Sequence, residues 1–494
     1  MSICSNTDSE GSRRSPLASA PAFLLLLCFS SVLCLRIGFS LPFAPSVLAA
    51  LLLSIGWGLL GTTRLQPSSG TVALCLLLIG MSGIAIIAHK ATTRASFMTR
   101  VETTATVLSS RGWGFGSVAL VRSRAHRSTY LLKFSGAPPK PGDVVSFSGV
   151  LKPFKRATGH DFDEFLYWRA KGALGYIENP QLLQLGTTAG FARWRYLLSK
   201  RIRKTLPPLT AGYMLAVTTG EREGSIESLH RSAGTSHLLA VSGFHVGLVW
   251  AATWLLFRRF RHRLIAISIC IWLYTLLSGA APSALRAAFM IQLAILGRMM
   301  GRARQKEGGS FNTVSMAGAI LLLLNPWLFW DIGWRLSMLA ALAITSASCL
   351  VTASSWMRTL LAGSLVWLAT SLQASRTFGG VPLAGLFLNF IALPVFSFLY
   401  PLAIALSTPA LLGLPGGSML ARLPEFFFRR WETFTANALY LLPREISFSP
   451  ATLLFGTSFV VFCLASACGF SKWRALSVSA LTAGMAFFLP AFAL

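Results

Sequence analysis

The residues best suited to chemistry lie in an otherwise apolar stretch, residues 234–249, which carries His237, Ser242 and His245 together with three glycines. Polar and ionisable groups at membrane depth usually face a bundle interior or a water-filled path. These side chains are therefore candidates to donate hydrogen bonds to a polar substrate. Ser242 followed by Gly243 also marks a point where a helix can break and free its backbone groups. A tightly packed helix with hydrogen-bonded histidines fits the same residues equally well.

Catalysis is the main alternative chemistry for this stretch. Ser242 and His245 are a hydroxyl and an imidazole on one segment, as in a hydrolase, but a spacing of three does not establish nucleophile and base geometry. No acidic residue lies nearby in the sequence. The seven histidines also lack the His-Glu-x-x-His and His-x-His spacings of catalytic zinc sites. We therefore expect no enzyme, no catalytic residue, no metal and no cofactor.

The composition predicts the elements that position these residues. The chain has 494 residues, of which 54% are hydrophobic and 12% charged, as expected of a polytopic α-helical membrane protein. The net charge of +28 does not by itself indicate a polyanionic partner, because cytoplasmic loops of membrane proteins are rich in Lys and Arg.

Apolar runs predict roughly ten to twelve membrane segments, some of them broken or re-entrant. The first run, 17–35, is interpreted as an uncleaved helix because it is long and no small-x-small cleavage site follows it. Further runs lie at 47–60, 72–88, 264–277, 285–296, 314–324, 336–351, 360–372, 383–406, 453–468 and 476–492, with a weaker one at 211–219.

Residues 92–185 have a different pattern, which predicts a small β domain inserted between membrane segments. Alternating runs at 101–108, 117–122, 129–134 and 144–151 suit half-buried strands. An amphipathic helix at 161–171 and a last strand near 173–177 follow. A small barrel of OB type fits this order, although a helix before the final strand is unusual in that fold.

Basic and aromatic residues alternate in this β domain. Cations for phosphates and flat rings for bases are what single-stranded nucleic acid requires. A basic surface beside anionic lipid, with its aromatics in the core, explains the same residues equally well. The DNA-binding candidates are Arg122, Arg124, Arg127, Lys133, Trp113 and Tyr130.

The order of segments predicts four regions and a topology. They are N-terminal transmembrane helices (1–91), the OB-like extracytoplasmic domain (92–185), amphipathic or interfacial linker helices (186–233) and a transmembrane core (234–494). A cytoplasmic N-terminus places the β domain outside after three crossings. The basic loops at 258–263 and 298–306 then face the cytoplasm, as the positive-inside rule requires.

Several motifs occur in order along the chain. The segment 237–246 reads His-Leu-Leu-Ala-Val-Ser-Gly-Phe-His-Val and strongly resembles the hallmark of the ComEC family of competence proteins. The resemblance continues through a Gly...Pro-Ser-Ala-Leu-Arg-Ala segment at 279–287, an Asn-Pro...Leu-Ser block at 325–337 and an Asn...Pro helix at 389–394. Upstream, residues 141–143 and 162–172 resemble the OB-like extracytoplasmic domain of that family.

The resemblance implies a channel that conducts single-stranded DNA across the bacterial cytoplasmic membrane during natural transformation. Its partners would be single-stranded DNA, the lipid bilayer, a DNA receptor and a cytoplasmic motor, since this chain has no Walker A motif. A separate nuclease and a second copy of the chain are further candidate partners. The translocation-path candidates are His237, Ser242, His245, Arg286, Arg335 and Asn389.

The chain also departs from the family pattern. Arg335 stands where many members have Gln, and Glu221 stands where many have Asp. Many relatives end in a metallo-β-lactamase-like domain that we do not find here, so we expect no nuclease activity in this chain. The alternatives are a transporter of another anionic polymer or of a lipid-linked glycan, and an intramembrane hydrolase.

Overall fold

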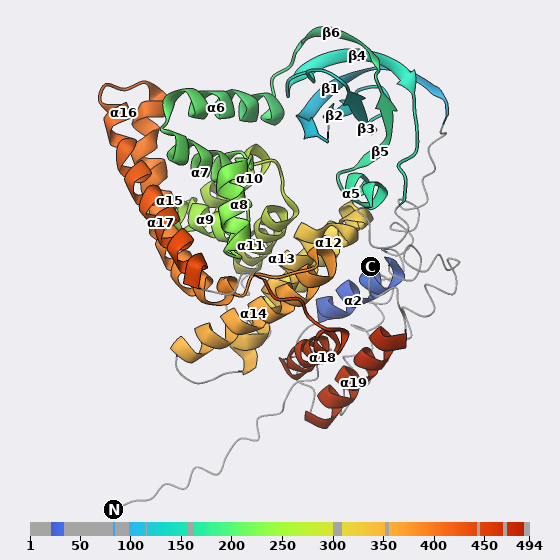
Figure 1. Ribbon diagram of the computed structural model, residues 1–494, viewed down its shortest axis with the longest axis vertical. Coiled ribbons are helices and arrows are strands. Elements are labelled where there is room, and N and C mark those ends of the chain that lie inside the picture. The colour runs from blue at the N-terminus through green and yellow to red at the C-terminus, as the bar shows by residue number, and fades with distance from the viewer. Residues whose placement is uncertain are drawn as a thin grey trace, which may run out of the picture.

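The structure is a computed structural model that describes residues 21–33, 83, 98–114, 116–156, 163–299, 309–350, 355–441, 445–467 and 472–488. It is mostly helical, with one small mixed sheet at one end of the molecule (Figure 1). The predicted membrane segment 47–60 lies outside the described residues, as does 72–88 apart from Gly83.

The sheet has six strands in the order β5-β3-β2-β1-β4-β6. Strand β3 pairs parallel with β5, and every other neighbouring pair is antiparallel. The alternation of small or apolar residues places one face inward, so that Ala105, Val107, Val145 and Phe147 form part of a buried core. The strands are β1 (Arg100–Trp113), β2 (Gly116–Ser123), β3 (Thr129–Phe134), β4 (Asp143–Val150), β5 (Ala173–Glu178) and β6 (Gln181–Thr187).

A backbone bridge joins the end of β4 to β5. The Lys152 amide donates to the Tyr176 carbonyl at 2.8 Å, and the Tyr176 amide donates to the Lys152 carbonyl at 3.0 Å. The bridge thus links the two ends of the β4-β1-β2-β3-β5 series.

The expectation that the strand near 173–177 is the last was wrong, because β6 follows it and pairs with β4. All seven residues of β6 are exposed. Its sequence, Gln-Leu-Leu-Gln-Leu-Gly-Thr, also lacks the alternation that signals a half-buried strand.

Helices form at the predicted apolar runs of the described residues, and the longest helix that was not predicted is α17. Helix α17 buries only a narrow stripe that includes Pro424, Phe428, Trp431 and Thr435. Charged residues interrupt its sequence, so no apolar run predicted this helix. The helices are α2 (Pro21–Leu33), α5 (Glu164–Ala170), α6 (Phe191–Thr205), α7 (Pro208–Thr218), α8 (Gly224–Ser232), η2 (Ser236–Leu238), α9 (Gly243–Leu256), α10 (Arg263–Leu277), α11 (Pro282–Met299), α12 (Gly309–Leu324), η3 (Pro326–Trp330), α13 (Ile332–Leu350), α14 (Ser355–Phe378), α15 (Ala384–Leu412), α16 (Gly417–Leu420), α17 (Arg422–Leu441), α18 (Pro450–Ala467) and α19 (Lys472–Phe488).

Two described helices, α15 and α18, are long and apolar enough to cross a membrane. Shorter apolar helices occupy Gly243–Leu256, Arg263–Leu277, Phe311–Leu324 and Ile332–Ser348. A membrane protein is therefore plausible from the described helices.

Helix α6 runs between the sheet and the helical body (Figure 1). At the sheet, Arg195 Nη2 donates to the Leu108 carbonyl at 2.9 Å. At the body, Arg203 pairs with Glu221 at 2.8 Å, and Arg201 donates to the Leu411 carbonyl. Basic residues of the predicted linker helix thus hold the sheet and the body together.

Candidate functional site

The predicted helix break lies where α9 begins. Helix η2 ends at Leu238, and α9 starts at Gly243 with Ser242 as its N-cap in an extended conformation. The Ser242 side chain accepts from the backbone of His245, and the His245 side chain accepts from the Ser242 amide at 3.3 Å. This reciprocal capping satisfies donors that a helix start leaves free.

His245 is buried at 1% exposure, and its imidazole packs against Tyr400 with ring centroids 5.1 Å apart. Its Nδ1 lies 3.2 Å from Ser242 Oγ, whereas its buried Nε2 has no hydrogen-bond partner among the described residues. The pair thus serves as a helix cap, and no described carboxylate orients the imidazole as in a catalytic triad.

Arg286 reaches the start of α9 from helix α11. Its Nε donates to Ser337 Oγ of α13 at 2.9 Å, and its Nη1 lies 3.7 Å from Met290 Sδ. Its Nη2 lies 3.3 Å from the position that a Cβ on Gly243 would occupy. The absence of a side chain at Gly243 therefore lets a guanidinium approach the first turn of α9.

The charge of Arg286 is uncompensated within the described part of the chain. The side chain is 9% exposed, and no described carboxylate lies within 4 Å of it. A helix N-terminus carries a partial positive charge, so the α9 start adds to the cation instead of neutralising it. A buried unpaired charge is costly, and an anion at this place would offset both.

The other three path candidates have different surroundings from those of Arg286. Arg335 donates from Nε to the Phe329 carbonyl at 2.7 Å and stacks over Trp330 at 4.9 Å, which are helix-holding contacts. Asn389 Oδ1 on α15 is buried with no partner among the described residues, and His237 is exposed on η2. Ser242, His245 and Arg286 are thus grouped around one helix start.

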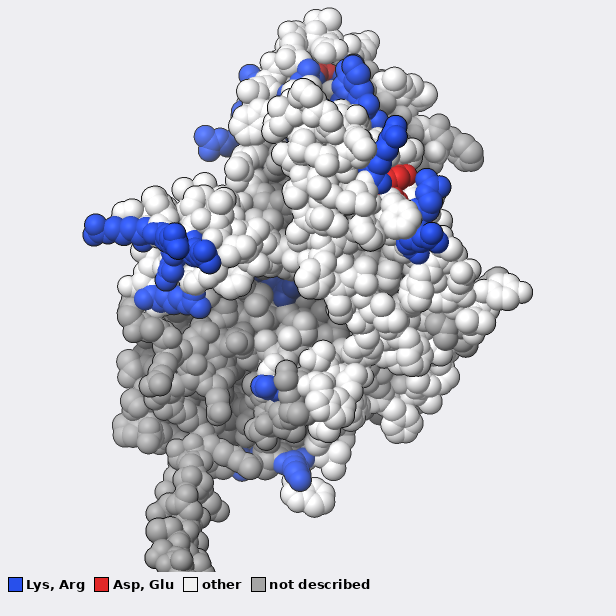
Figure 2. All heavy atoms as spheres, turned by 90° about the vertical axis from the view of Figure 1, so that its left-hand side faces the viewer, with Lys and Arg blue, Asp and Glu red and all other residues white. Residues whose placement is uncertain are grey.

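The DNA-binding candidates of the sheet fall into separate places. Arg122, Arg124 and Arg127 are exposed around the turn that joins β2 to β3. Trp113 lies at the opposite end of β2, opposite Gly116 in the register. Basic side chains far outnumber acidic ones on the face shown in Figure 2.

Two candidates are engaged inside the domain. Tyr130 is 5% exposed and packs edge-on against Phe147, so the prediction that its ring offers a stacking surface is corrected. Its alternating position in β3 turns it into the core. Lys133 pairs with Glu164 at 3.1 Å and lies over the Tyr176 ring at 4.2 Å.

Trp113 belongs to an aromatic cluster that sequence reasoning did not assemble. Its ring stacks on Tyr167 with centroids 5.6 Å apart, and the Arg111 guanidinium lies 4.9 Å from the Trp113 centroid. The signal was present as an alternation of basic and aromatic residues, but α5 had to dock against the β1–β2 hairpin to bring Tyr167 there.

Helix α5 docks the sheet onto the helical body through η3. Phe165 meets Trp327 edge-on with centroids 5.2 Å apart, and the Arg169 guanidinium lies over the same indole at 4.7 Å. Asn325 Nδ2 donates to the Ala170 carbonyl at 2.9 Å. The sheet is therefore fixed beside the body at two places, α5 and α6.

The bridge between Lys152 and Tyr176 lies beside an ion pair. Lys152 Nζ lies 2.6 Å from Glu178 Oε2. The hydrogen bond to Glu178 raises the pKa of Lys152, and the same bond lowers the pKa of Glu178. Both side chains are more than one third exposed, so solvent weakens their contribution.

The start of α9 and its arginine fall within a known family region. A family model described as competence protein matches residues 217–485, more than half of the chain. The chain belongs to the competence protein family. The resemblance to ComEC is thereby confirmed.

The chain is similar to ComE operon protein 3 of Bacillus subtilis (strain 168), with 28% identity over 225 residues. The match covers 42% of this chain and 28% of that protein, so the chain spans well under two thirds of its relative. No solved structure matches.

All six path candidates lie inside the competence region, and the sheet lies outside it. The structure adds Ser337 and Gly243 to the candidate site. Both were part of the motifs that carried the resemblance, so the signal existed. Their roles depend on contacts among α9, α11 and α13, and a local sequence pattern does not predict contacts between distant helices. No group of three His, Cys, Asp or Glu in the described ranges is placed to hold a metal ion.

Proposed function

We propose that this competence protein is a multi-pass channel that conducts single-stranded DNA across the bacterial cytoplasmic membrane. The observation that carries the proposal is the buried Arg286 guanidinium at the start of α9, which has no described carboxylate partner. DNA supplies a phosphate charge at every nucleotide. A strand passing this point would offset the cation without requiring a particular base.

The sheet supports the same proposal as an OB-like receiving domain outside the membrane. Its bridge from Lys152 to Tyr176 joins the strand ends, which fits a small closed barrel. We place this domain at 92–185, with β6 extending it to Thr187. The remaining regions are the N-terminal helices (1–91), the linker helices (186–233) and the core (234–494).

In this arrangement a strand would enter beneath the sheet and descend past α9. Figure 2 shows a hollow below the sheet end, with basic side chains visible inside it. Arg258, Arg259, Arg261 and Arg263 then follow α9 on the side that the positive-inside rule assigns to the cytoplasm. The proposed partners are DNA, lipid, a DNA receptor, a motor and a separate nuclease, with self-association as a further proposal.

Replacing Arg286 tests the proposal. Cells that carry Arg286→Gln should take up labelled DNA into the cytoplasm about tenfold less well or worse, because a charge-assisted hydrogen bond contributes roughly 1.5–3 kcal/mol. Arg298→Gln is the matched control, since Arg298 is exposed on the same helix. Both variants must reach the membrane in equal amounts.

Normal uptake with Arg286→Gln would remove Arg286 from the path. A wild-type protein that moves anionic polysaccharide and not DNA would favour the alternative polymer transporter. Loss of uptake in the Arg298 control as well would show that overall basicity, rather than the α9 site, matters.

A further inference from the structure

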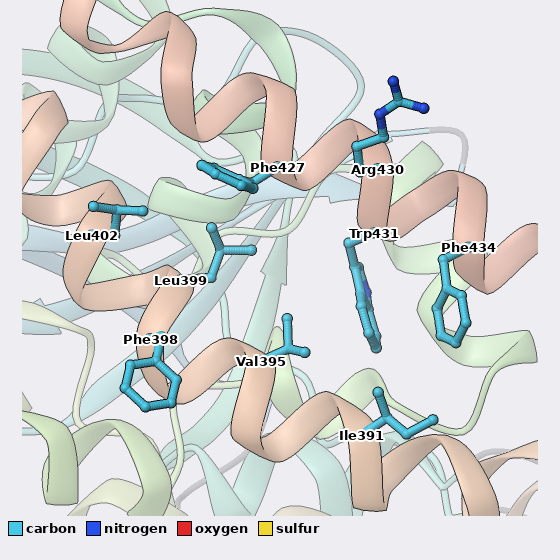
Figure 3. A pocket seen from close by; sticks show the side chains of 9 residues that line it. All are labelled: Ile391, Val395, Phe398, Leu399, Leu402, Phe427, Arg430, Trp431 and Phe434. Atoms are coloured by element: carbon cyan, nitrogen blue, oxygen red, sulfur yellow. The ribbon is translucent and has the colours of Figure 1, made fainter.

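An apolar groove lies on the outer side of helices α15 and α17, away from the α9 site. It has a volume of about 450 Å³ and nine lining residues, within the roughly 300–1,000 Å³ typical of small-molecule sites. Side chains from both helices extend into the space between them, and Arg430 points away from it (Figure 3). The lining residues are Ile391, Val395, Phe398, Leu399, Leu402, Phe427, Arg430, Trp431 and Phe434.

The walls of the groove are apolar and exposed. On α15, Ile391, Val395 and Leu402 are 47%, 36% and 37% exposed. On α17, Phe427 and Phe434 are 41% and 43% exposed. Helix α15 is also one of the two candidate membrane spans, and only 33% of its most apolar window is buried. Hydrocarbon is the solvent that such a face fits.

The floor of the groove offers an indole N–H donor without an acceptor among the described residues. Trp431 is 5% exposed, and its indole Nε1–H is buried with no acceptor among the described residues. A buried donor without a partner destabilises the folded state, and a bound acceptor removes that cost. An ester carbonyl at the head of an acyl chain is an acceptor that can accompany an apolar tail.

The rim of the groove offers one cation. Arg430 is exposed, and no described carboxylate lies within 4 Å of its guanidinium, whereas its neighbour Arg429 pairs with Glu425 at 3.4 Å. The Arg430 guanidinium lies 5.2 Å from the Phe426 ring centroid. It faces outward (Figure 3), on the side where a headgroup would lie if its tail filled the groove.

We infer that this groove binds an anionic glycerophospholipid, with an acyl chain between α15 and α17, an ester carbonyl near Trp431 and the phosphate near Arg430. The three chemical parts of the lipid match the apolar walls, the unused donor and the unpaired cation. This inference rests on the proposed membrane placement and is independent of DNA transport.

Lipid retention by the purified full chain tests the site. Native mass spectrometry after release from detergent, with phosphatidylglycerol or phosphatidylcholine added, should show a preference for phosphatidylglycerol. Arg430→Gln should reduce that preference about fivefold, since a basic residue near anionic lipid contributes about 1 kcal/mol. Val395→Trp, which fills the groove from its rim, should reduce binding of both lipids.

Arg422→Gln is the matched control, because Arg422 is exposed on α17 but does not line the groove. It should retain the wild-type preference, and all variants should keep wild-type helical content by circular dichroism. Equal lipid binding by wild type, Arg430→Gln and Val395→Trp would overturn the inference. So would wild-type protein that retains only detergent.

A second copy of the chain is the competing occupant. Phe398→Cys places a thiol at the most exposed hydrophobic position of the groove lining, where the side chain is 78% exposed. Efficient disulfide cross-linking between two copies through residue 398, unaffected by added lipid, would assign the groove to self-association. Absence of such a cross-link, together with the lipid preference, supports the lipid site. Neither result depends on DNA uptake, so the channel proposal can fail separately.

Discussion

Cations are held differently in the sheet and in the helical core. In the sheet domain, Lys133 lies 3.1 Å from Glu164 and Lys152 lies 2.6 Å from Glu178. In the core, Arg286 is more deeply buried, yet its partners are a serine hydroxyl and a methionine sulfur. Protein carboxylates thus pair with these two cations of the sheet domain, whereas the core presents a buried cation with no described carboxylate partner.

The difference bears on which residues serve stability and which serve function. A surface ion pair contributes little to stability, and a buried charge without a partner opposes folding. Arg286 therefore has no evident value for folding alone. Its presence beside the α9 start is easier to explain if an anionic substrate passes there.

The first prediction tests this contrast by comparing the stability of two variants, one in the core and one in the sheet. In the first variant, Arg286→Met, an apolar side chain of similar length replaces the core cation. The free energy of unfolding of the purified protein should stay unchanged or rise by about 1 kcal/mol or more. Lys133→Met in the sheet should instead lower stability, by up to about 1 kcal/mol, because it leaves Glu164 unpaired. Thermal unfolding in detergent measures both.

An Arg286→Met protein that unfolds at markedly lower temperature than wild type would contradict the contrast. Arg286 would then be a structural residue whose hydrogen bond to Ser337 holds α11 and α13 together.

A smaller effect concerns the exposed arginines of the β2–β3 turn. If they contact phosphates, changing Arg122, Arg124 and Arg127 together to Ser should weaken binding of single-stranded DNA by the full chain. The slope of log affinity against log salt concentration should become less steep by about 2, because each of the three lost phosphate contacts contributes about 0.7. Fluorescence anisotropy of a labelled oligonucleotide at several salt concentrations gives this slope.

The matched control is the same triple change to Lys, which keeps the charge and should keep the slope. An unchanged slope in the Ser variant would mean that these side chains are only a solvated surface, as the lipid-surface interpretation of the basic residues allows.

The smallest effect is a pH dependence at the bridge between Lys152 and Tyr176. The pKa of Glu178 is lowered by its hydrogen bond to Lys152, so this stabilisation is present above the ordinary value of 4.5 and is lost as the pH falls through the lowered pKa. The pKa of Lys152 is raised from 10.5, so its contribution is lost only as the pH rises through that raised pKa.

Glu178→Gln should therefore reduce protection of the Lys152 and Tyr176 amides in hydrogen exchange at neutral pH. Wild type and variant should converge as the pH approaches the lowered pKa of Glu178. A difference that persists unchanged in acid would show that the ion pair does not strengthen the bridge.

Much of the local structure could be predicted from the sequence. Apolar runs such as 264–277 and 453–468 form α10 and α18. In an apolar environment a helix lets such a run make its backbone hydrogen bonds within the segment. The helix break at Gly243 was also visible, since Ser followed by Gly favours an N-cap.

Other features could not be predicted because they depend on partners distant in the chain. Strand β6 is fully exposed and has no alternation to detect, and its place comes from pairing with β4. Tyr130 was chosen as a stacking residue from its neighbours in the sequence, but the register of β3 turns it into the core.

The sequence by itself determined the helical class of most segments, the β domain and the membership of the competence family, because apolar length, alternation and ordered motifs are local properties. Only the tertiary structure decided which motif residues act together. Arg286 meets Ser337 across 51 positions and approaches Gly243 on a third helix. Such an encounter is fixed by how α9, α11 and α13 pack, and packing is a property of the whole fold.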